Sequence, residues 1–351
     1  KNKKKNFDII EIHNRPLVFI QLKKTLLSKF ILYFHNDPLT MKGSKTKEER
    51  LILLNSIDKI IFVSSWVQKR FFINLDNKLI HKTEIVYPSI SKAKKIPIKA
   101  KKITFVGKLN ESKGYDIYGD SIIKILNKFK DWKAFSIGDE SRNKPKFYHP
   151  NHEDLGYLTH KKVLKFLETS EIAVVPSRWE EPFGRTALES TSRGCATIIS
   201  NRGGLPETSD HSIILDRLDS NELFKVINNL IINDRLRKKI QLNGFNNVKH
   251  LIKENSSLLD DIREELVPSY KLNYNKNRLR IVNIYNLGQK LNHRLYNISL
   301  GKKFTNGFIR NNHDVLEISD RDFIKQNRGF GLKTTENKFQ EYLIETFKNY
   351  N

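Results

Sequence analysis

The sequence predicts an α/β protein whose domains are built on doubly wound parallel sheets. Apolar strand patterns alternate with helix patterns at short spacing, which is typical of such sheets. Glycine or proline follows several of the strands, and open parallel sheets bind their ligands at these strand ends. The alternating segments are strands at 103–106, 133–137, 171–175 and 196–200, with a helix at 159–167.

The amino-terminal part predicts a separate first domain. It carries three further strand patterns with helix patterns between them, at 7–13, 30–35 and 59–63. A Lys-rich stretch that contains Pro88 and Pro97 follows, and such stretches commonly join domains. We therefore predict a first domain at 1–87 and a linker at 88–101.

The carboxyl-terminal part predicts the end of a second domain and the start of another. Three helix patterns complete the second domain, at 221–232, 234–248 and 256–266. We predict this domain at 102–268 and a linker at 269–277. A strand, a loop around Gly288, a helix and a strand follow, the regular segments lying at 279–285, 302–310 and 315–318. This order is typical of the opening of a doubly wound domain, so we predict a partial third unit at 278–351.

Two glutamates lie where a nucleotide-sugar would need them. Glu181 lies in the loop after Pro176, and Glu189 lies inside the helix that Gly184 opens. A carboxylate accepts hydrogen bonds in pairs, so one glutamate can hold vicinal hydroxyls of a sugar and the other those of a ribose. The free N–H groups at the start of the helix can face a diphosphate. This pattern predicts a sugar-transfer site.

These residues resemble the donor half of the retaining glycosyltransferases of family 4, which have the GT-B fold of two Rossmann-like domains. Glu181 and Glu189 match the E-x7-E element of that family, and residues 203–207 match its G-G-x-P-E turn. Two glutamates at this spacing occur by chance in many chains, but here ordered features flank them. The resemblance covers residues 7–268. It implies that Glu181 contacts the transferred sugar and that Glu189 contacts the ribose.

Residues 103–114 are similar to the phosphate element of the same family, F-V-G-R-L…K-G. As the bond to the diphosphate breaks, negative charge grows on phosphate oxygens, and preorganised cations lower that barrier. Lys108 and Lys113 are expected to supply the cations. Lys108 stands where the family more often has Arg, so the bidentate fork is lost while the charge stays. Solvated surface lysines are the alternative in so basic a chain.

Further donor contacts are implied by the same resemblance. Gly138 and Gly156 lie at strand ends whose loops touch the base and the sugar in the family, although ordinary turn glycines are the alternative. The residues expected to bind the nucleotide-sugar are Gly107, Lys108, Lys113, Gly138, Gly156, Phe183, Gly184, Arg185 and Glu189.

His13 is a candidate catalytic residue at the end of the first strand pattern. In the resembling family a histidine at this strand end points into the cleft near the sugar and the diphosphate. A histidine capped by backbone is the alternative. We expect a catalytic role for His13 together with Lys108, Lys113 and Glu181.

The resemblance is incomplete at both ends of the chain. The first strand of the acceptor domain and its glycine loop are missing, so nearly half of that domain is expected before residue 1. Residues 278–351 are similar to the start of spore-maturation-protein-like glycosyltransferases, which makes the chain look like the middle of a tandem enzyme. Asp320 and Asp322 fit a D-x-D metal pattern, but strand-end turn chemistry explains them more simply, and we expect no metal site.

Composition sets weaker bounds on function. The chain of 351 residues has 63 Lys and Arg against 39 Asp and Glu, a formal net charge of +24. This excess is compatible with nucleic acid, with anionic membrane or with a Lys-rich proteome. The lysines are spread along the chain without a known nucleic-acid-binding motif, which argues against nucleic acid. The single Cys195 excludes an internal disulfide and is typical of a reducing compartment.

The sequence thus predicts a metal-independent, retaining glycosyltransferase without a cofactor. It is expected to move a sugar from a nucleotide-sugar to a glycan or lipid-linked acceptor, in the synthesis of a surface polysaccharide or lipopolysaccharide. A cytoplasmic location is expected, with peripheral contact with the inner face of the cell membrane as an option. A family member with a soluble acceptor is the rival enzyme. The alternative from another class is a basic nucleic-acid- or membrane-binding protein with a vestigial glycosyltransferase fold.

Overall fold

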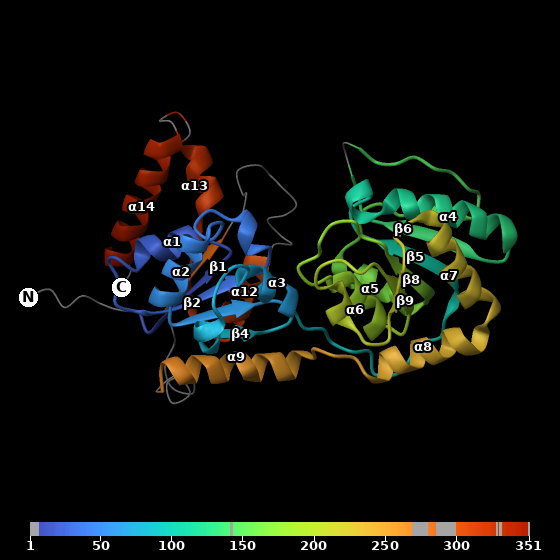
Figure 1. Ribbon diagram of the computed structural model, residues 1–351, viewed down its shortest axis with the longest axis horizontal. Helices are drawn as coiled ribbons and strands as arrows, with labels where there is room; N and C mark the ends of the chain where they lie inside the picture. Colours follow the sequence, from blue (N-terminus) through green and yellow to red (C-terminus); the bar gives the residue numbers. More distant parts are fainter. Residues whose placement is uncertain are drawn as a thin grey trace, which may run out of the picture. The chain divides into compact units, whose positions relative to one another are not determined.

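The computed structural model describes residues 7–140, 143–268, 280–285, 300–327, 329 and 332–349. These residues form two compact units, each built on its own six-stranded parallel sheet (Figure 1). The first unit holds the residues up to 63, residues 67–86 and those from 256 onward, and the second holds residues 64–66 and 87–255. The α/β class with two Rossmann-like units is thereby confirmed.

The first sheet has the strand order β12-β11-β1-β2-β3-β4, and its neighbouring strands all run parallel. Strand β2 is buried from Phe30 to Phe34, as expected of a central strand whose two faces are both covered. The strands of this sheet are β1 (Ile9–His13), β2 (Lys29–Phe34), β3 (Lys59–Phe62), β4 (Thr83–Ile85), β11 (Arg280–Tyr285) and β12 (Asp314–Ser319).

The helices of the first unit begin at recognisable sequence signals. Pro16 opens α1, and Thr46 with Glu49 forms a capping box at the start of α2. Two helices, α3 and α9, begin with residues of the second unit and continue into the first. The helices are α1 (Pro16–Leu22), α2 (Lys47–Ser56), α3 (Ser65–Phe71), α9 (Ile252–Leu266), α12 (Leu300–Arg310), α13 (Asp320–Gln326) and α14 (Leu332–Asn349), with short 3-10 turns at Pro38–Thr40 and Asn77–Lys82.

Strands β11 and β12 belong to the first sheet, which corrects the prediction of a partial third unit. Ile284 of β11 lies opposite Ile12 of β1, and β12 pairs with β11 along its whole length. A strand, helix and strand cannot by themselves cover both faces of a sheet, and pairing with β1 gives their backbone groups partners. The predicted linker at 269–277 and the loop around Gly288 lie outside the described residues.

Helix α9 packs on the first sheet, whereas the sequence placed residues 256–266 in the second domain. Ile262 lies in an apolar cluster with Ile31 and Tyr33 of β2. Arg263 of the same helix pairs with the buried Glu11 of β1 at 2.8 Å. An amphipathic helix shows which of its faces is apolar, but not which sheet will cover that face.

The second sheet has the order β10-β9-β8-β5-β6-β7, again with parallel neighbours. Along β8, Ile172 and Val174 pack against the side covered by α4 and α7, while Ala173 between them packs against α5. Helices therefore cover both faces, as a doubly wound sheet requires (Figure 1). The strands are β5 (Ala100–Val106), β6 (Lys133–Ile137), β7 (His152–Asp154), β8 (Ser170–Val175), β9 (Ala196–Ile199) and β10 (Ile213–Ile214).

The helices of the second unit include those predicted at 159–167, 221–232 and 234–248, each to within two residues. They are α4 (Tyr115–Lys128), α5 (His160–Glu168), α6 (Arg185–Ser192), α7 (Ser220–Ile232) and α8 (Asp234–Asn246), with short 3-10 turns at Glu111–Lys113 and Leu205–Thr208. The predicted linker at 88–101 lies in this unit. Its Ile90 is buried and donates its N–H to the carbonyl of His250, and Ala100 opens β5.

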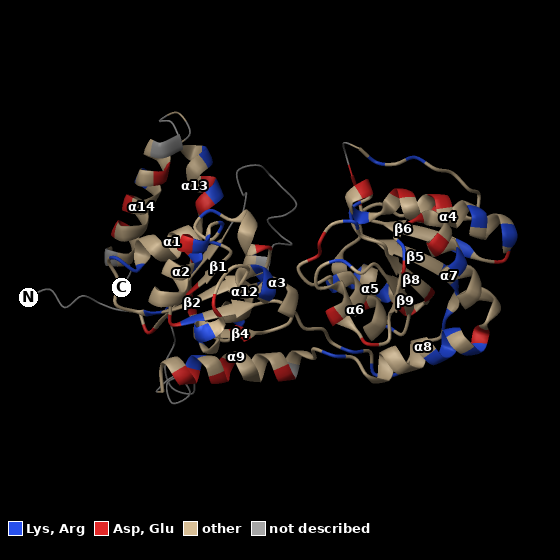
Figure 2. Cartoon of the chain, viewed as in Figure 1, with Lys and Arg blue, Asp and Glu red and all other residues tan. Residues whose placement is uncertain are grey.

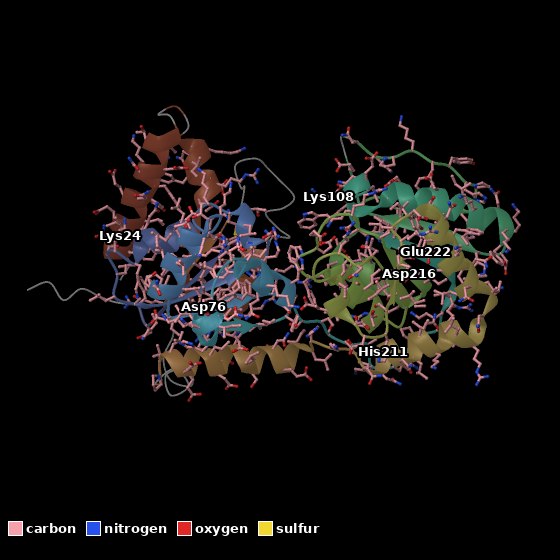
Figure 3. The ribbon with its side chains drawn as sticks, in the orientation of Figure 1. Lys24, Asp76, Lys108, His211, Asp216 and Glu222 are labelled. Atoms are coloured by element: carbon pink, nitrogen blue, oxygen red, sulfur yellow. The ribbon has the colours of Figure 1, made fainter. Side chains whose placement is uncertain are left out.

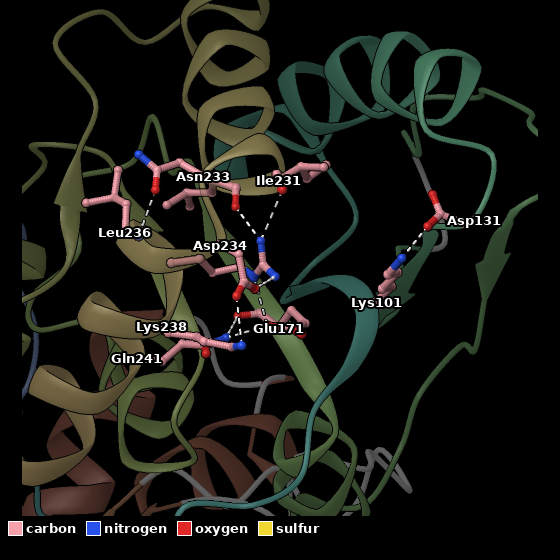
Figure 4. Close-up of polar contacts among 11 residues, drawn as sticks. Lys101, Asp131, Glu171, Ile231, Asn233, Asp234, Leu236, Lys238 and Gln241 are labelled. Atoms are coloured by element: carbon pink, nitrogen blue, oxygen red, sulfur yellow. Dashed lines mark hydrogen bonds and ion pairs between the residues drawn. The ribbon is translucent and has the colours of Figure 1, made fainter.

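A buried polar network ties α8 to the start of β8 (Figure 4). Arg237 is 5% exposed and donates to the Glu171 carboxylate at 2.9 Å, while Gln241 donates to the same carboxylate at 2.7 Å. Arg237 also donates to the carbonyl of Ile231, which caps the end of α7. The network therefore fixes the strand that leads to the predicted donor loop.

Charge is distributed over both units, as the sequence indicated. Lys and Arg lie on many elements and are interspersed with Asp and Glu (Figure 2). No helix among the described residues has the length and apolar character that crossing a membrane requires.

Candidate active site

A pocket opens at the carboxyl ends of β5 and β8 in the second unit. It has about 390 Å³ of unfilled space, its open mouth included. Strand ends of this kind are where doubly wound sheets bind ligands, so the pocket lies where the sequence predicted a site. Its lining residues are Phe105, Val106, Gly107, Lys113, Val175, Ser177, Glu181, Gly184, Arg185 and Thr186.

The amino-terminal end of helix α6 faces this pocket. Gly184 is its N-cap residue, has φ +95° and makes no side-chain cap, while Arg185 and Thr186 line the pocket. A Cβ on Gly184 would lie 2.4 Å from the Leu205 side chain, so glycine is required on both counts. The first N–H groups of a helix attract anions, and this end offers them to the pocket.

Lys113 and Glu181 form an ion pair at the pocket wall. The Lys113 Nζ donates to Glu181 Oε1, and the two side chains are 22% and 12% exposed. Lys113 ends the 3-10 turn that precedes α4, and Asn110 caps this turn by accepting from the Lys113 N–H. An ammonium and a carboxylate thus lie side by side at the pocket. The ammonium can bind phosphate, and the carboxylate can accept hydrogen bonds from sugar hydroxyls.

Glu189 lies about one turn after the start of α6 and is buried. His160 Nε2 lies 2.9 Å from Glu189 Oε1, and an Arg185 Nη lies 3.4 Å from the same oxygen. Both contacts are made by one carboxylate oxygen. The carboxylate is therefore held in one orientation from two sides.

Gly138 and Gly156, which follow β6 and β7, lie close to the backbone of Gly107 or to each other. Gly138 has φ +149°, and a Cβ there would lie 1.7 Å from the carbonyl oxygen of Gly107, which itself lines the pocket. The N–H of Gly138 donates to the carbonyl of Gly156 at 2.8 Å. Gly138 and Gly156 are not among the lining residues. Gly138 therefore packs directly against the backbone of the lining residue Gly107.

The glycine turn after β9 holds the loop that carries Glu181. A Cβ on Gly203 would lie 2.1 Å from the carbonyl oxygen of Glu181, and the Gly204 N–H donates to that oxygen at 2.7 Å. The Gly203 N–H donates to the Glu180 carboxylate at 2.6 Å. The backbone of the glycine turn therefore packs directly against the backbone of the loop that carries Glu181.

Five of the residues predicted to bind the donor do not line the pocket: Lys108, Gly138, Gly156, Phe183 and Glu189. The side chain of Lys108 is exposed in the turn after β5 and is not among the lining residues (Figure 3). Phe183 is 3% exposed and packs with Ile90 and Leu188, so its ring belongs to the core.

His13 lies in the first unit, at the carboxyl end of β1. It is buried, its Nδ1 lies 2.9 Å from His35 Nε2, and its ring stacks on Tyr33 with centroids 4.3 Å apart. Phe304 of α12 covers it with a centroid separation of 4.7 Å. Because one imidazole donates to the other, at least one ring nitrogen must be an unprotonated acceptor.

Acid should destabilise this histidine pair. Burial, and secondarily Arg263, lowers the pKa of His13 to about 3, and burial followed by the charge of His13 lowers the pKa of His35. The unfolded chain then binds more protons than the folded chain below pH 6.5. Stability is therefore present above the unfolded pKa of about 6.5 and is lost as the pH falls from there toward about 3.

We expect His35→Gln to flatten the pH dependence of the free energy of unfolding. Between pH 7.5 and 5.5 the wild-type protein should lose about 1.4 kcal/mol more than the variant, the cost of one histidine that the fold keeps neutral. Urea titrations at both pH values measure this difference, with the exposed His81→Gln as the control. Equal pH dependence in wild type and His35→Gln would contradict it.

The D-x-D candidate has another use in the structure. Asp320 pairs with Arg15, and the N–H of Asp322 donates to Ser319 Oγ, which caps α13. Among the described residues no group of three or more His, Cys, Asp or Glu side chains could hold a metal ion.

Sequence reasoning did not name several residues at or beside the pocket, among them the lining residues Phe105, Val106 and Val175. Ser177 and Thr186 line it, His160 contacts Glu189, and Trp179 lies against Lys113 with its ring centroid 4.1 Å from Nζ. Ser177 and Thr186 lie inside the donor motif and could have been named from it. The contacts of His160 and Trp179 join distant segments, so the linear pattern carries no signal for them.

Comparisons with known proteins show what this chain is similar to. Residues 87–247 match the family model described as glycosyl transferases group 1. The putative glycosyltransferase YtcC of Bacillus subtilis is 26% identical over 284 residues, which are 70% of this chain and 69% of that protein. An uncharacterized glycosyltransferase of Methanocaldococcus jannaschii is 30% identical over 234 residues, 64% of either protein.

A solved structure shares the fold. Anabaena HepE in complex with UDP and glucose superposes with a TM-score of 0.58 at 15% identity, over 73% of this chain and 77% of that chain. These similarities do not favour the alternative of a basic binding protein with a vestigial fold. They confirm the resemblance seen in the donor motifs. The chain is therefore a glycosyltransferase with the GT-B fold, and its residues 87–247 match the family model of glycosyl transferases group 1.

Proposed function

We propose that the chain transfers a sugar from a nucleotide-sugar donor to a glycan or lipid-linked acceptor with retention of anomeric configuration. The observation that carries this proposal is the meeting of Lys113, Glu181 and the open amino-terminal end of α6 at one pocket. The pocket provides a cation, free N–H groups and a carboxylate together. This set suits a diphosphate with a sugar attached.

Each group has a distinct part in the proposed chemistry. The Lys113 ammonium and the first N–H groups of α6 bind the diphosphate and stabilise the charge that grows on it as the glycosidic bond breaks. Glu181 accepts hydrogen bonds from the transferred sugar, and Glu189 accepts them from the ribose. Lys108, whose side chain is exposed beside Gly107, adds a more distant positive charge.

The proposed reaction requires little acid–base catalysis by side chains of the protein. In a front-face transfer the departing phosphate oxygen accepts the proton of the acceptor hydroxyl while the new glycosidic bond forms on the same face. The protein then contributes mainly position and charge stabilisation.

The acceptor proposal rests on charge. With a net charge of +24, the protein should be attracted to an anionic membrane surface from the cytoplasm, where a lipid-linked acceptor of a polysaccharide or lipopolysaccharide pathway would lie. A soluble acceptor would show no dependence of rate on anionic lipid.

Turnover tests the proposed reaction. The chain is incubated with a panel of nucleotide-sugars and with soluble or lipid-linked glycan acceptors, and release of the nucleoside diphosphate is followed. We expect one donor to be used, with NMR showing the same anomeric configuration in product and donor. A product of inverted configuration would contradict the proposed mechanism.

The two carboxylates should be separable by their ligands. Glu189→Gln is expected to weaken binding of the nucleoside diphosphate and of the nucleotide-sugar alike, because both contain the ribose. Glu181→Gln is expected to weaken only the nucleotide-sugar, by about tenfold for one lost charged hydrogen bond. Calorimetric titration gives the ratio of the two affinities. An equal loss for both ligands in Glu181→Gln would show that the two roles are wrongly assigned.

A further inference from the structure

Two side chains contact the Lys113 ammonium, the ring of Trp179 and the carboxylate of Glu181. The Lys113 Nζ lies 4.1 Å from the centroid of the Trp179 ring and donates to Glu181. A cation over the face of an indole is attracted by the ring quadrupole, and Trp gives the strongest attraction of the aromatic side chains. Lys113 lines the pocket, whereas Trp179, which is 46% exposed, does not line it.

The loop of Trp179 is tied to the turn that carries Lys113. The backbone N–H groups of Arg178 and Trp179 both donate to the carbonyl of Ser112, at 3.0 and 2.9 Å. The Arg178 guanidinium makes two hydrogen bonds of 2.6 Å to the Asp116 carboxylate and a third of 2.7 Å to the carbonyl of Glu111. The ring and the lysine are therefore fixed on one frame.

The frame also depends on a glycine. Gly114 follows Lys113 with φ +71°, and a Cβ there would lie 1.9 Å from the carbonyl oxygen of Pro176. The chain segment before Trp179 thus rests directly on the backbone after Lys113. Such close backbone approach leaves little freedom between the two segments.

We propose that Trp179 is a positioning residue that presets the Lys113 ammonium for the diphosphate of the donor. A lysine has a flexible stem and three rotatable donors, and its free side chain would lose much rotamer entropy on binding phosphate. The attraction of the indole face removes part of that freedom beforehand. Of the three N–H groups of the ammonium, one donates to Glu181 and one can point toward the ring, which leaves one for a phosphate oxygen.

This inference rests on the proposed function, since it concerns the affinity of the donor site for a diphosphate. Its consequence is specific. Weakening the cation–ring contact should reduce affinity for a nucleoside diphosphate and spare the nucleoside, which has no group for Lys113 to bind.

A double-mutant cycle tests the inference. Dissociation constants for the nucleoside diphosphate that the wild-type protein binds best, and for its nucleoside, are measured for Trp179→Phe, Trp179→Leu, Lys113→Met and the Trp179→Leu/Lys113→Met pair. We expect Trp179→Leu to weaken the diphosphate about three- to thirtyfold and Trp179→Phe to lie between it and wild type. In the Lys113→Met background Trp179→Leu should have no further effect. Tyr148→Leu removes an exposed aromatic of the same unit and should change neither constant.

The possible outcomes distinguish a failure of the positioning role of Trp179 from a failure of the proposed function. A wild-type protein that binds diphosphate no more tightly than nucleoside would contradict the proposed function itself. If wild type prefers the diphosphate but Trp179→Phe and Trp179→Leu match it, the positioning role is overturned. Equal losses for nucleoside and diphosphate, or a full Trp179→Leu effect without Lys113, would overturn it as well. If Trp179→Leu does not fold, the cycle with Trp179→Phe decides by the same criteria.

Discussion

Replacing Lys113 by Met is expected to weaken binding of a nucleoside diphosphate about ten- to a hundredfold, the loss of one charge-assisted contact worth about 1.5 to 3 kcal/mol. The Lys113 ammonium is mostly buried at the pocket wall, so water cannot replace it at low cost. Met keeps the length and apolar stem of the side chain. The change therefore removes the charge while the packing beside Trp179 is largely kept.

Titration calorimetry with the diphosphate and with the nucleoside measures this effect. The nucleoside should be affected far less, since it carries no phosphate. Lys108→Met is expected to have a smaller effect because its side chain is exposed, and Lys124→Met on the outer face of α4 should have none. Equal weakening of nucleoside and diphosphate would mean that Lys113 supports the fold instead of the ligand.

Replacing Arg237 by Ala is expected to lower the free energy of unfolding by about 3 to 5 kcal/mol, the usual cost of leaving a buried charge without its partner. Arg237 and Glu171 are 6% and 13% exposed at their side chains and lie 2.9 Å apart. Without the guanidinium, the Glu171 carboxylate keeps only the Gln241 donor, and the last carbonyls of α7 lose theirs.

Urea unfolding compares this variant with a neighbour on the same helix. Lys238 pairs with Asp234 at 2.7 Å but is 70% exposed, and Lys238→Ala should change stability by less than about 0.5 kcal/mol. A similar small change in both variants would show that the network in Figure 4 contributes little to folding.

The donor half could be predicted from the sequence because its signals are local. Strands β5 and β8 are short apolar runs that end at Gly107 and Pro176, and Gly184 opens α6 at a position that only a residue tolerant of positive φ can fill. Motifs of this kind combine a strand end, a turn and a helix start within a few residues. The same locality placed Lys113 and Glu181 at one pocket.

The strand order of the first unit could not be predicted in the same way. Strand β11 pairs with β1 although some 270 residues separate them, and a strand pattern does not state its partner. The local pattern at 280–319 was recognised correctly as strand, helix and strand, but its assignment to a separate unit was wrong. The prediction that α9 belongs to the second domain was wrong for a related reason, because the apolar face of the helix could pack on either sheet.

Contacts across the candidate site could not be predicted from the sequence either. The Lys113–Glu181 pair and the Lys113–Trp179 contact join segments that the fold alone brings together. Phe183 shows the reverse case, because its place in the motif suggested a ligand contact while its ring packs in the core with Leu188.

A crystal structure of the chain with a bound nucleoside diphosphate tests the account most directly. We expect the diphosphate at the amino-terminal end of α6, within hydrogen-bonding distance of the Thr186 N–H and the Lys113 ammonium, with the ribose hydroxyls on the Glu189 carboxylate. A diphosphate bound elsewhere, with the Lys113–Glu181 pair undisturbed and the pocket filled only by water, would contradict the assignment of this site.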